Sequence, residues 1–138
     1  MRVNAYLLFD GRCEEAFRFY EKCLRGKIIA MLTHKGTPAE EHVPAGWRDK
    51  ILHARLDIGD QVLMASDSPP DRYEKPAGFS VSLQVKTPTE AERLFNALAE
   101  KGQIRMPLEK TFWSPSFGML VDRFGIPWMI NCEPQTAS

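Results

Sequence analysis

Two segments of the chain carry apolar residues at the spacing of an amphipathic helix. The first segment predicts a helix over 13–24, with Gly26 as its C-terminal stop. The second predicts a helix over about 89–101, because the sequence TPTE at 87–90 is a capping box with proline at the first helical position. The apolar stripes consist of Cys13, Ala16, Phe17, Tyr20, Cys23 and Leu24 in the first helix, and of Ala91, Leu94, Phe95 and Leu98 in the second.

Short runs of β-branched, aromatic and aliphatic residues surround the two predicted helices. In the first half of the chain they predict strands over 3–9, 27–33, 51–58 and 61–66, and the polar stretch 34–50 reads as a long loop. In the second half they predict strands over 79–85, 103–106, 117–122 and 126–132. Each half therefore has the order strand, helix, strand, strand, strand.

The sequence also repeats itself in detail. Five of the six positions in EAFRFY at 15–20 match EAERLF at 90–95, the exception being Phe17 against Glu92. LDIGDQVLM at 56–64 also resembles VDRFGIPWM at 121–129. Self-similarity of this kind indicates two copies of one structural unit. We expect one domain of α+β class, with repeat one over 1–66, a proline-rich linker over 67–78, repeat two over 79–132 and a tail over 133–138.

Side-chain alternation divides each sheet into two faces. His53, Arg55 and Asp57 point to one side of their strand, and Ser80, Ser82 and Gln84 to one side of theirs, while the apolar neighbours point to the other. A helix would cover the apolar side. The polar sides would then face water, a partner or a cavity, and two half-barrels with facing polar sides would enclose such a cavity.

Composition narrows the possible partners. The 18 basic and 18 acidic residues cancel, so no electrostatic footprint indicates binding to nucleic acid or to an anionic membrane. No apolar run is long enough to span a bilayer, and the N-terminal apolar stretch is too short for a signal peptide. Three cysteines without C-x-x-C spacing argue against disulfides and for a reduced, cytoplasmic protein.

The tandem order, together with the segments FDGRCEEAFRFY, KILHARLDIGDQVLMASDSPP and LFNALAEKGQIRMPLEKTFWSPSFGMLVDRFGIPWMINC, resembles the PhnB-like branch of the vicinal-oxygen-chelate superfamily. This superfamily includes glyoxalase I and the bleomycin-resistance proteins. The resemblance implies tandem βαβββ units that form half-barrels, and a symmetric homodimer. Many PhnB-like proteins carry a demethylubiquinone-methyltransferase label, but this sequence has no Gly-rich strand-to-helix loop for a nucleotide cofactor.

The resemblance also implies four inward-facing metal positions, which fall at Ala5, Met64, Ser80 and Met129. None of these side chains offers the imidazole, thiolate or carboxylate that zinc, nickel or manganese requires. We therefore expect no metal and no other cofactor.

Five residues are predicted to contact a ligand, namely His53, Met64, Ser82, Trp113 and Asn131. Four of them have an alternative: His53 could be structural, Trp113 could anchor its loop or lie in a subunit interface, and Ser82 and Asn131 could bond other polar groups. Asp67 is expected to form a local Asx-type turn.

Three functions remain open from the sequence. The first is a metal-free small-molecule-binding protein of the PhnB-like glyoxalase or bleomycin-resistance type, with an unknown ligand. The second is an enzyme of the lyase or dioxygenase kind, either metal-dependent or using His53 for acid–base chemistry. The third is an interaction module without a ligand. No catalytic residue is assigned.

Overall fold

The computed structural model describes residues 1–134. It divides into two compact units, Met1–Glu74 and Lys75–Ser138, and the division lies inside the predicted linker 67–78. Of the predicted tail, residues 135–138 lie outside the described part of the chain. That the two units make up one domain stays a prediction.

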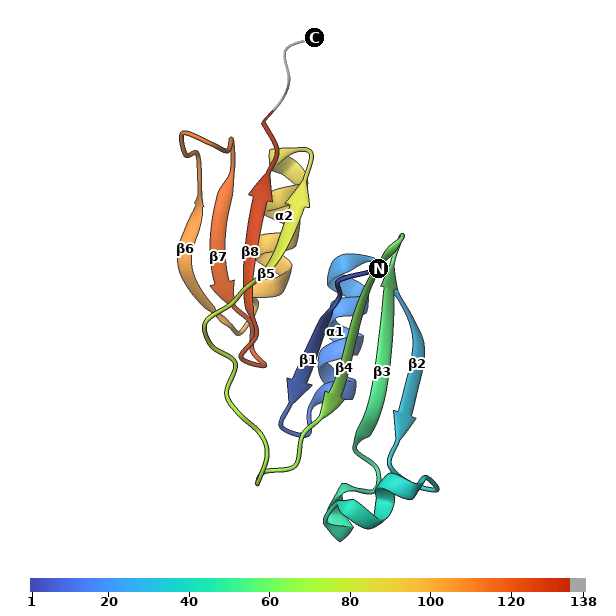
Figure 1. Cartoon of the computed structure of the whole chain (residues 1–138). Helices are drawn as coiled ribbons and strands as arrows, with labels where there is room; N and C mark the ends of the chain where they lie inside the picture. The colour runs from blue at the N-terminus through green and yellow to red at the C-terminus, as the bar shows by residue number, and fades with distance from the viewer. Residues whose placement is uncertain (135–138) are drawn as a thin grey trace. The chain divides into compact units, whose positions relative to one another are not determined.

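The first unit is a four-stranded sheet with a helix on one face (Figure 1). Its elements are β1 (Ala5–Phe9), α1 (Cys13–Leu24), β2 (Lys27–Thr33), β3 (Ile51–Ile58) and β4 (Gln61–Asp67). The strands lie in the order β1-β4-β3-β2, with β1 parallel to β4 and the other neighbours antiparallel. The helix packs on β2, β3 and β4 and leaves the opposite face of the sheet open.

The second unit repeats this arrangement. Its elements are β5 (Val81–Val85), α2 (Pro88–Ala99), β6 (Gln103–Glu109), β7 (Phe117–Val121) and β8 (Pro127–Cys132). The strand order is β5-β8-β7-β6, again with one parallel pair, β5 and β8, and antiparallel neighbours elsewhere. The predicted α+β fold of two βαβββ units is therefore confirmed.

Every predicted helix and strand is present, and its ends differ from the predicted ones by at most three residues. α1, β2 and β3 begin and end at the predicted residues, whereas β6 continues to Glu109, three residues beyond its predicted end. The predicted loop 34–50 contains two short 3-10 helices, Pro38–His42 and Ala45–Trp47. The hydrophobic periodicity of the sequence does not predict these helices, because each is too short to show an apolar stripe.

The apolar stripes form the core between helix and sheet. Phe9, Phe17 and Tyr20 are buried, and their ring centroids lie 6.0 to 6.4 Å apart. In the second unit Phe95 and Leu98 of α2 are buried together with Trp128 of β8. Burial of each such side chain stabilises the fold by roughly 1.5–3 kcal/mol.

A left-handed residue lies before the glycine at the end of each helix, directly after α1 but separated from α2 by Glu100, so Gly26, the predicted C-terminal stop, is not the left-handed residue. The left-handed residue after α1 is Arg25, with φ 52°, and the one after α2 is Lys101, with φ 58°. The glycine follows one position later. A Cβ atom on Gly26 would lie 2.7 Å from the carbonyl oxygen of Asp57, and one on Gly102 would overlap the carbonyl oxygen of Val121. These glycines are required for close approach to a strand.

Candidate functional site

The open face of the first sheet carries a contact between Tyr6 and His53. The Tyr6 hydroxyl lies 3.2 Å from His53 Nδ1, and the rings stack with centroids 5.9 Å apart. Met64 lies beside Tyr6 in the β1–β4 pairing, and it also faces Arg55 across β3 and β4. Arg55 in turn forms an ion pair with Asp57 at 2.7 Å. This face therefore combines an aromatic pair, a thioether and a charge pair.

The open face of the second sheet carries a chain of polar side chains. Asn131 Nδ2 donates to Gln84 Oε1 at 2.8 Å, and Gln84 Nε2 donates to Ser82 Oγ at 3.0 Å. These contacts join β5 to β8, where Ser82 pairs with Met129 and Gln84 with Asn131. Ser82 and Gln84 are exposed, so the chain borders solvent.

Aromatic side chains adjoin the polar chain at one end. Phe117 faces Asn131 across β7 and β8. Trp113, in the loop between β6 and β7, packs edge-on against Phe117 with ring centroids 5.3 Å apart, and its ring centroid lies 4.8 Å from that of Phe112. Trp113 keeps 44% of its surface exposed. Flat apolar surface beside polar groups is typical of small-molecule sites.

The five predicted ligand residues fall into two groups. His53 and Met64 lie on the open face of the first sheet. Tyr6 contacts His53 and lies beside Met64. Ser82, Trp113 and Asn131 gather on the second sheet, where Gln84 and Phe117 connect them. The sequence argument missed Tyr6, Gln84 and Phe117 as site residues, although strand alternation places Gln84 on the face of Ser82. That these residues bind a ligand stays a prediction.

The residue assigned to the first metal position is wrong by one place. Ala5 shares the side of β1 that buries Leu7 and Phe9 against α1, whereas Tyr6 points to the open face beside Met64. A one-residue shift in a strand exchanges its two faces. The corrected position still offers no suitable donor, since a neutral phenol and the thioethers of Met64 and Met129 are poor ligands for zinc, nickel or manganese.

No group of three or more His, Cys, Asp or Glu side chains that could hold a metal ion occurs in residues 1–134. The donor chemistry at the superfamily's metal positions therefore does not fit a metal.

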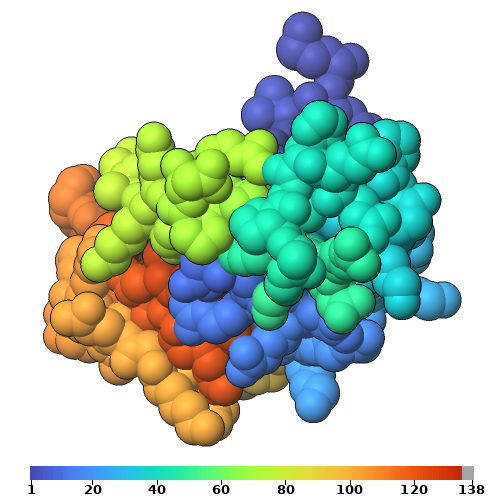
Figure 2. All heavy atoms as spheres, turned by 90° about the horizontal axis from the view of Figure 1, so that it is seen from below, coloured from blue at the N-terminus to red at the C-terminus, as the bar shows by residue number. Residues whose placement is uncertain are grey.

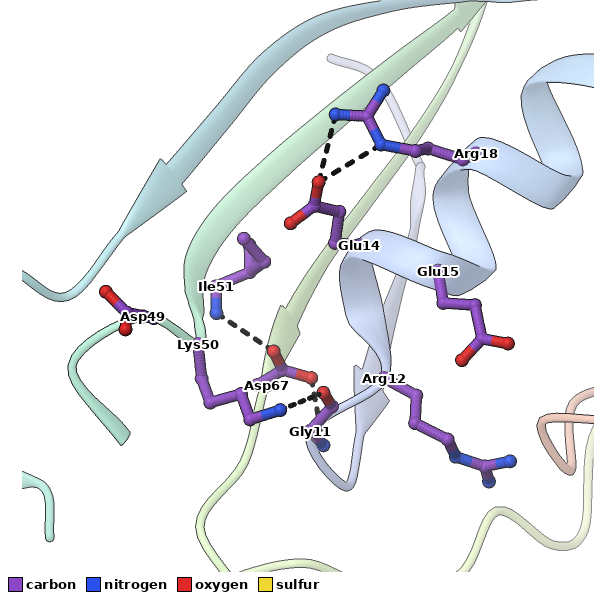
Figure 3. A pocket seen from close by; sticks show the side chains of 9 residues that line it. All are labelled: Gly11, Arg12, Glu14, Glu15, Arg18, Asp49, Lys50, Ile51 and Asp67. Carbon is purple, nitrogen blue, oxygen red and sulfur yellow. Dashed lines mark hydrogen bonds and ion pairs between the residues drawn. The ribbon is translucent and has the colours of Figure 1, made fainter. Parts of the chain in front are cut away.

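Asp67 is a buried anchor, and the predicted Asx-type turn is wrong. Its Oδ1 accepts hydrogen bonds from the backbone N–H groups of Gly11 and Cys13, at 3.0 and 2.9 Å, and its Oδ2 accepts one from Ile51 at 2.9 Å. The side chain thus joins the end of β4 to the start of α1 and the start of β3 (Figure 3). Negative charge at a helix N-terminus is stabilised by the helix dipole.

A cavity of about 430 Å³ adjoins this anchor. Figure 2 shows the teal loop 34–50 against the blue start of α1, and there Lys50 Nζ donates to the carbonyl oxygen of Gly11 at 3.0 Å. The charges that line the cavity are largely paired locally, with Arg18 on Glu14 at 3.0 Å and Arg12 on Asp10 at 3.0 Å. We therefore attribute this region to the structure of the first unit. Its lining residues are Gly11, Arg12, Glu14, Glu15, Arg18, Asp49, Lys50, Ile51 and Asp67.

The cysteines are buried thiols. All three are free, and Cys13 and Cys132 are fully buried. Burial raises the pKa of Cys13, and the negative charge of Asp67 raises it further. Burial also raises the pKa of Cys132. A nucleophilic cysteine requires the opposite shift, because the thiolate is the reactive form.

The two βαβββ units define the glyoxalase and bleomycin-resistance type of fold, within the vicinal-oxygen-chelate superfamily. The sequence model of the 3-demethylubiquinone-9 3-methyltransferase family matches residues 1–131, and the chain belongs to this PhnB-like family.

Relatives cover the chain almost completely. Protein YjdN of Escherichia coli (strain K12) is 32% identical over an alignment of 143 positions, which covers 98% of this chain and 97% of that protein. Protein PA1353 from Pseudomonas aeruginosa is 51% identical, with a TM-score of 0.89 over 98% of this chain and 99% of that one. The PhnB protein from Bacillus cereus is 25% identical, with a TM-score of 0.80 over 96% and 99%.

None of the helices within residues 1–134 has the length and apolar character needed to cross a membrane. The cytoplasmic location stays a prediction.

Proposed function

We propose that the protein binds a small organic molecule on the open faces of its sheets, without the help of a metal ion. The observation that carries this proposal is the half-exposed ring of Trp113, which Phe117 connects to the polar chain of Ser82, Gln84 and Asn131. Small-molecule sites combine apolar and aromatic surface with a few polar groups that fix orientation. His53 and Met64 supply a comparable combination on the first sheet.

The activity in the family's description is not part of this proposal. The turns that lead from a parallel strand into a helix are 10–12 in the first unit and 86–87 in the second, and together they contain one glycine, Gly11. A nucleotide-type cofactor is usually held by a glycine-rich loop at such a turn.

Affinity mass spectrometry tests the proposal directly. The full chain is incubated with a small-molecule extract of cells, separated from unbound compounds, and its retained compounds are identified. We expect at least one compound to be retained by the wild type and to bind Trp113→Ala more weakly by about 1–3 kcal/mol, since that variant removes a buried contact. Trp47→Ala is the matched control, because Trp47 lies in the 3-10 segment of the first unit. Equal retention by all three proteins would contradict the proposed site, and no retained compound would contradict the proposed function.

A second candidate function is acid–base catalysis by His53. The contact that favours it is the one with Tyr6: when the hydroxyl donates to Nδ1, the imidazole proton is on Nε2 and the ring orientation is fixed. Conversion of a retained compound, lost in His53→Gln with binding preserved, would establish this function. Binding without conversion would favour the binding protein.

We also infer a symmetric homodimer. Exposed apolar side chains lie on the edge strands of the first sheet, where Tyr6 and Leu8 belong to β1 and Ile29 and Leu32 to β2, and a second copy could cover them. Sedimentation at micromolar concentration should give about twice the chain mass of 15.7 kDa. A species with the mass of one chain would contradict this inference.

A further inference from the structure

The polar chain on the second sheet ends in an acceptor without a partner. Within residues 1–134, Asn131 Oδ1 is the only buried side-chain nitrogen or oxygen that makes no hydrogen bond. The other half of the same amide is bonded, since Nδ2 donates to Gln84 Oε1 at 2.8 Å. Buried polar groups in folded proteins nearly always have a hydrogen-bond partner, so a buried oxygen without one requires an explanation.

The direction of the hydrogen bonds in the polar chain determines which group of Asn131 has no partner. In the observed arrangement each amide donates toward Ser82, whose hydroxyl oxygen accepts from Gln84 Nε2 at 3.0 Å. The reversed arrangement would place Asn131 Nδ2, with two donors, in the buried position. A buried NH₂ group without partners leaves two hydrogens unsatisfied, whereas a buried carbonyl oxygen without a partner leaves one atom unsatisfied, so the observed arrangement costs less. The site therefore offers an acceptor.

The neighbours of this acceptor favour a positive group. Phe117 faces Asn131 across the β7–β8 pair, and Glu109 faces Phe117 across the β6–β7 pair. The row that runs across the sheet thus contains two amides, a phenyl ring and a carboxylate, and no basic side chain. Trp113 adds the edge-on ring at 5.3 Å from Phe117. Aromatic faces and carboxylates both attract cations.

We propose that this end of the second sheet binds a ligand through a protonated amine, which donates to Asn131 Oδ1 while the apolar body of the ligand packs on Trp113 and Phe117. The inference rests on the proposed function and adds the charge and donor group of the ligand. Because Oδ1 is buried in the free protein, a side chain must move before the ligand can reach it, and we expect Trp113 to move, since it is the exposed member of the aromatic pair. Carboxylates and phosphonates are disfavoured, since their oxygens would meet the lone pairs of Oδ1 and the charge of Glu109.

Three probes that share a phenyl ring test this proposal. 2-Phenylethylamine, 2-phenylethanol and phenylacetate are titrated at millimolar concentration into the ¹⁵N-labelled full chain at neutral pH. Nuclear magnetic resonance follows the side-chain NH₂ group of Asn131 and the indole N–H of Trp113. We expect the amine to shift both signals and to bind at least about tenfold more tightly than phenylacetate, with the alcohol between them.

Two substitutions of Asn131 separate binding from folding. Asn131→Leu removes the unsatisfied acceptor and should abolish the amine-induced shift at Trp113. The melting temperature should change little, because the only bond lost is the one from Nδ2 to Gln84, which is exposed and can bond water instead, and an apolar group replaces the desolvated Oδ1. Asn131→Asp keeps acceptor oxygens and adds a negative charge, so it should bind the amine more tightly than the wild type does. Asn96→Leu, the same change on the exposed face of α2, should alter neither readout.

Several results would overturn the inference. Phenylacetate that binds as tightly as the amine at Trp113, an unchanged amine affinity in Asn131→Leu, or weaker amine binding by a folded Asn131→Asp would each do so. Absence of binding by all three probes would also overturn it. The extract experiment would then still decide the proposed function, because it does not presuppose an amine.

Discussion

The two units have the same order of helix and strands, but different hydrogen bonds stabilise the start of the helix in each. In the first unit the carboxylate of Asp67, at the end of β4, accepts hydrogen bonds from Gly11 and Cys13 at the start of α1. In the second unit Thr87, directly before α2, caps its own helix by accepting from the N–H of Glu90 at 3.2 Å. The start of α1 is therefore held by a residue far away in the sequence, whereas the start of α2 is held by the residue directly before it. The strand order is repeated, whereas the side chains that hold it are not.

The open faces differ in the same way. Each face carries a methionine, Met64 or Met129, but the first also carries the Tyr6–His53 pair and the Arg55–Asp57 ion pair, whereas the second carries the amides of Gln84 and Asn131. The pseudo-equivalent backbone thus presents two chemically distinct surfaces. Specificity for a ligand can reside in one unit while the other retains only the fold.

The largest effect is expected at the tertiary anchor. Asp67→Ala leaves two buried backbone N–H groups and one part-buried one without an acceptor, and it should lower the free energy of unfolding by about 3–5 kcal/mol. Thr87→Ala removes one exposed cap and should cost about 1 kcal/mol. Urea denaturation measures both variants, with Asp71→Ala in the exposed linker as the control. Equal losses for Asp67→Ala and Thr87→Ala would show that the two starts are held equally strongly.

The second buried carboxylate should give a smaller loss. Asp122 accepts from the N–H groups of Phe124 and Ile126 and from Nε1 of Trp128, all at 2.8 to 3.0 Å. Two of these bonds lie within one turn, so the N–H groups of that turn can bond water after Asp122→Ala. We therefore expect the free energy of unfolding to fall by about 2–4 kcal/mol. The fluorescence of buried Trp128 should change in the native state. An unchanged spectrum would contradict the bond to its indole.

The two glycines that adjoin a strand test how closely the units correspond. Gly26→Ala and Gly102→Ala each place a methyl group against a strand carbonyl, and each should cost about 1–3 kcal/mol by overpacking. Gly46→Ala is the matched control, because nothing lies within 4 Å of its added Cβ and its φ is not positive. Denaturation midpoints compare the three variants. An unchanged midpoint for Gly26→Ala or Gly102→Ala would show that the two units do not correspond at that glycine.

The smallest effect is a pH dependence from Cys13. Since burial raises the pKa of this thiol in the folded protein, the folded state keeps its proton while the unfolded state loses it above about pH 8.5. The native state then binds more protons, so stability falls as the pH rises, by about 0.7 kcal/mol between pH 8 and 9 for one thiol. Cys13→Ala should lack that part of the slope. Identical slopes in the two proteins would mean that the thiol ionises normally when folded.

The sequence predicted the elements well because their signals are local. The stripe of α1 and the capping box before α2 each lie within one turn or one helix, and both are present in the structure. The role of Asp67 was not predictable in the same way, since its partners Gly11 and Ile51 are 56 and 16 residues away. The Ala5 assignment failed because a shift of one residue in a strand reverses the face.

The site was predicted only in part for the same reason. Strand alternation identified Ser82 and Asn131 as residues of an open face, and it placed Gln84 there too. It could not show that Gln84 bridges to Asn131, which is 47 residues away, or that the bridge leaves one oxygen unsatisfied. Such a property depends on the pairing of β5 with β8, which no local pattern specifies.

The most direct test of the central claim is a crystal structure of the full chain soaked with 2-phenylethylamine. We expect the ammonium nitrogen within about 2.7–3.2 Å of Asn131 Oδ1, with the phenyl ring against Trp113 and Phe117 and the indole moved from its position in the free protein. A ligand bound elsewhere, or one whose nitrogen makes no bond to Asn131, would contradict the account.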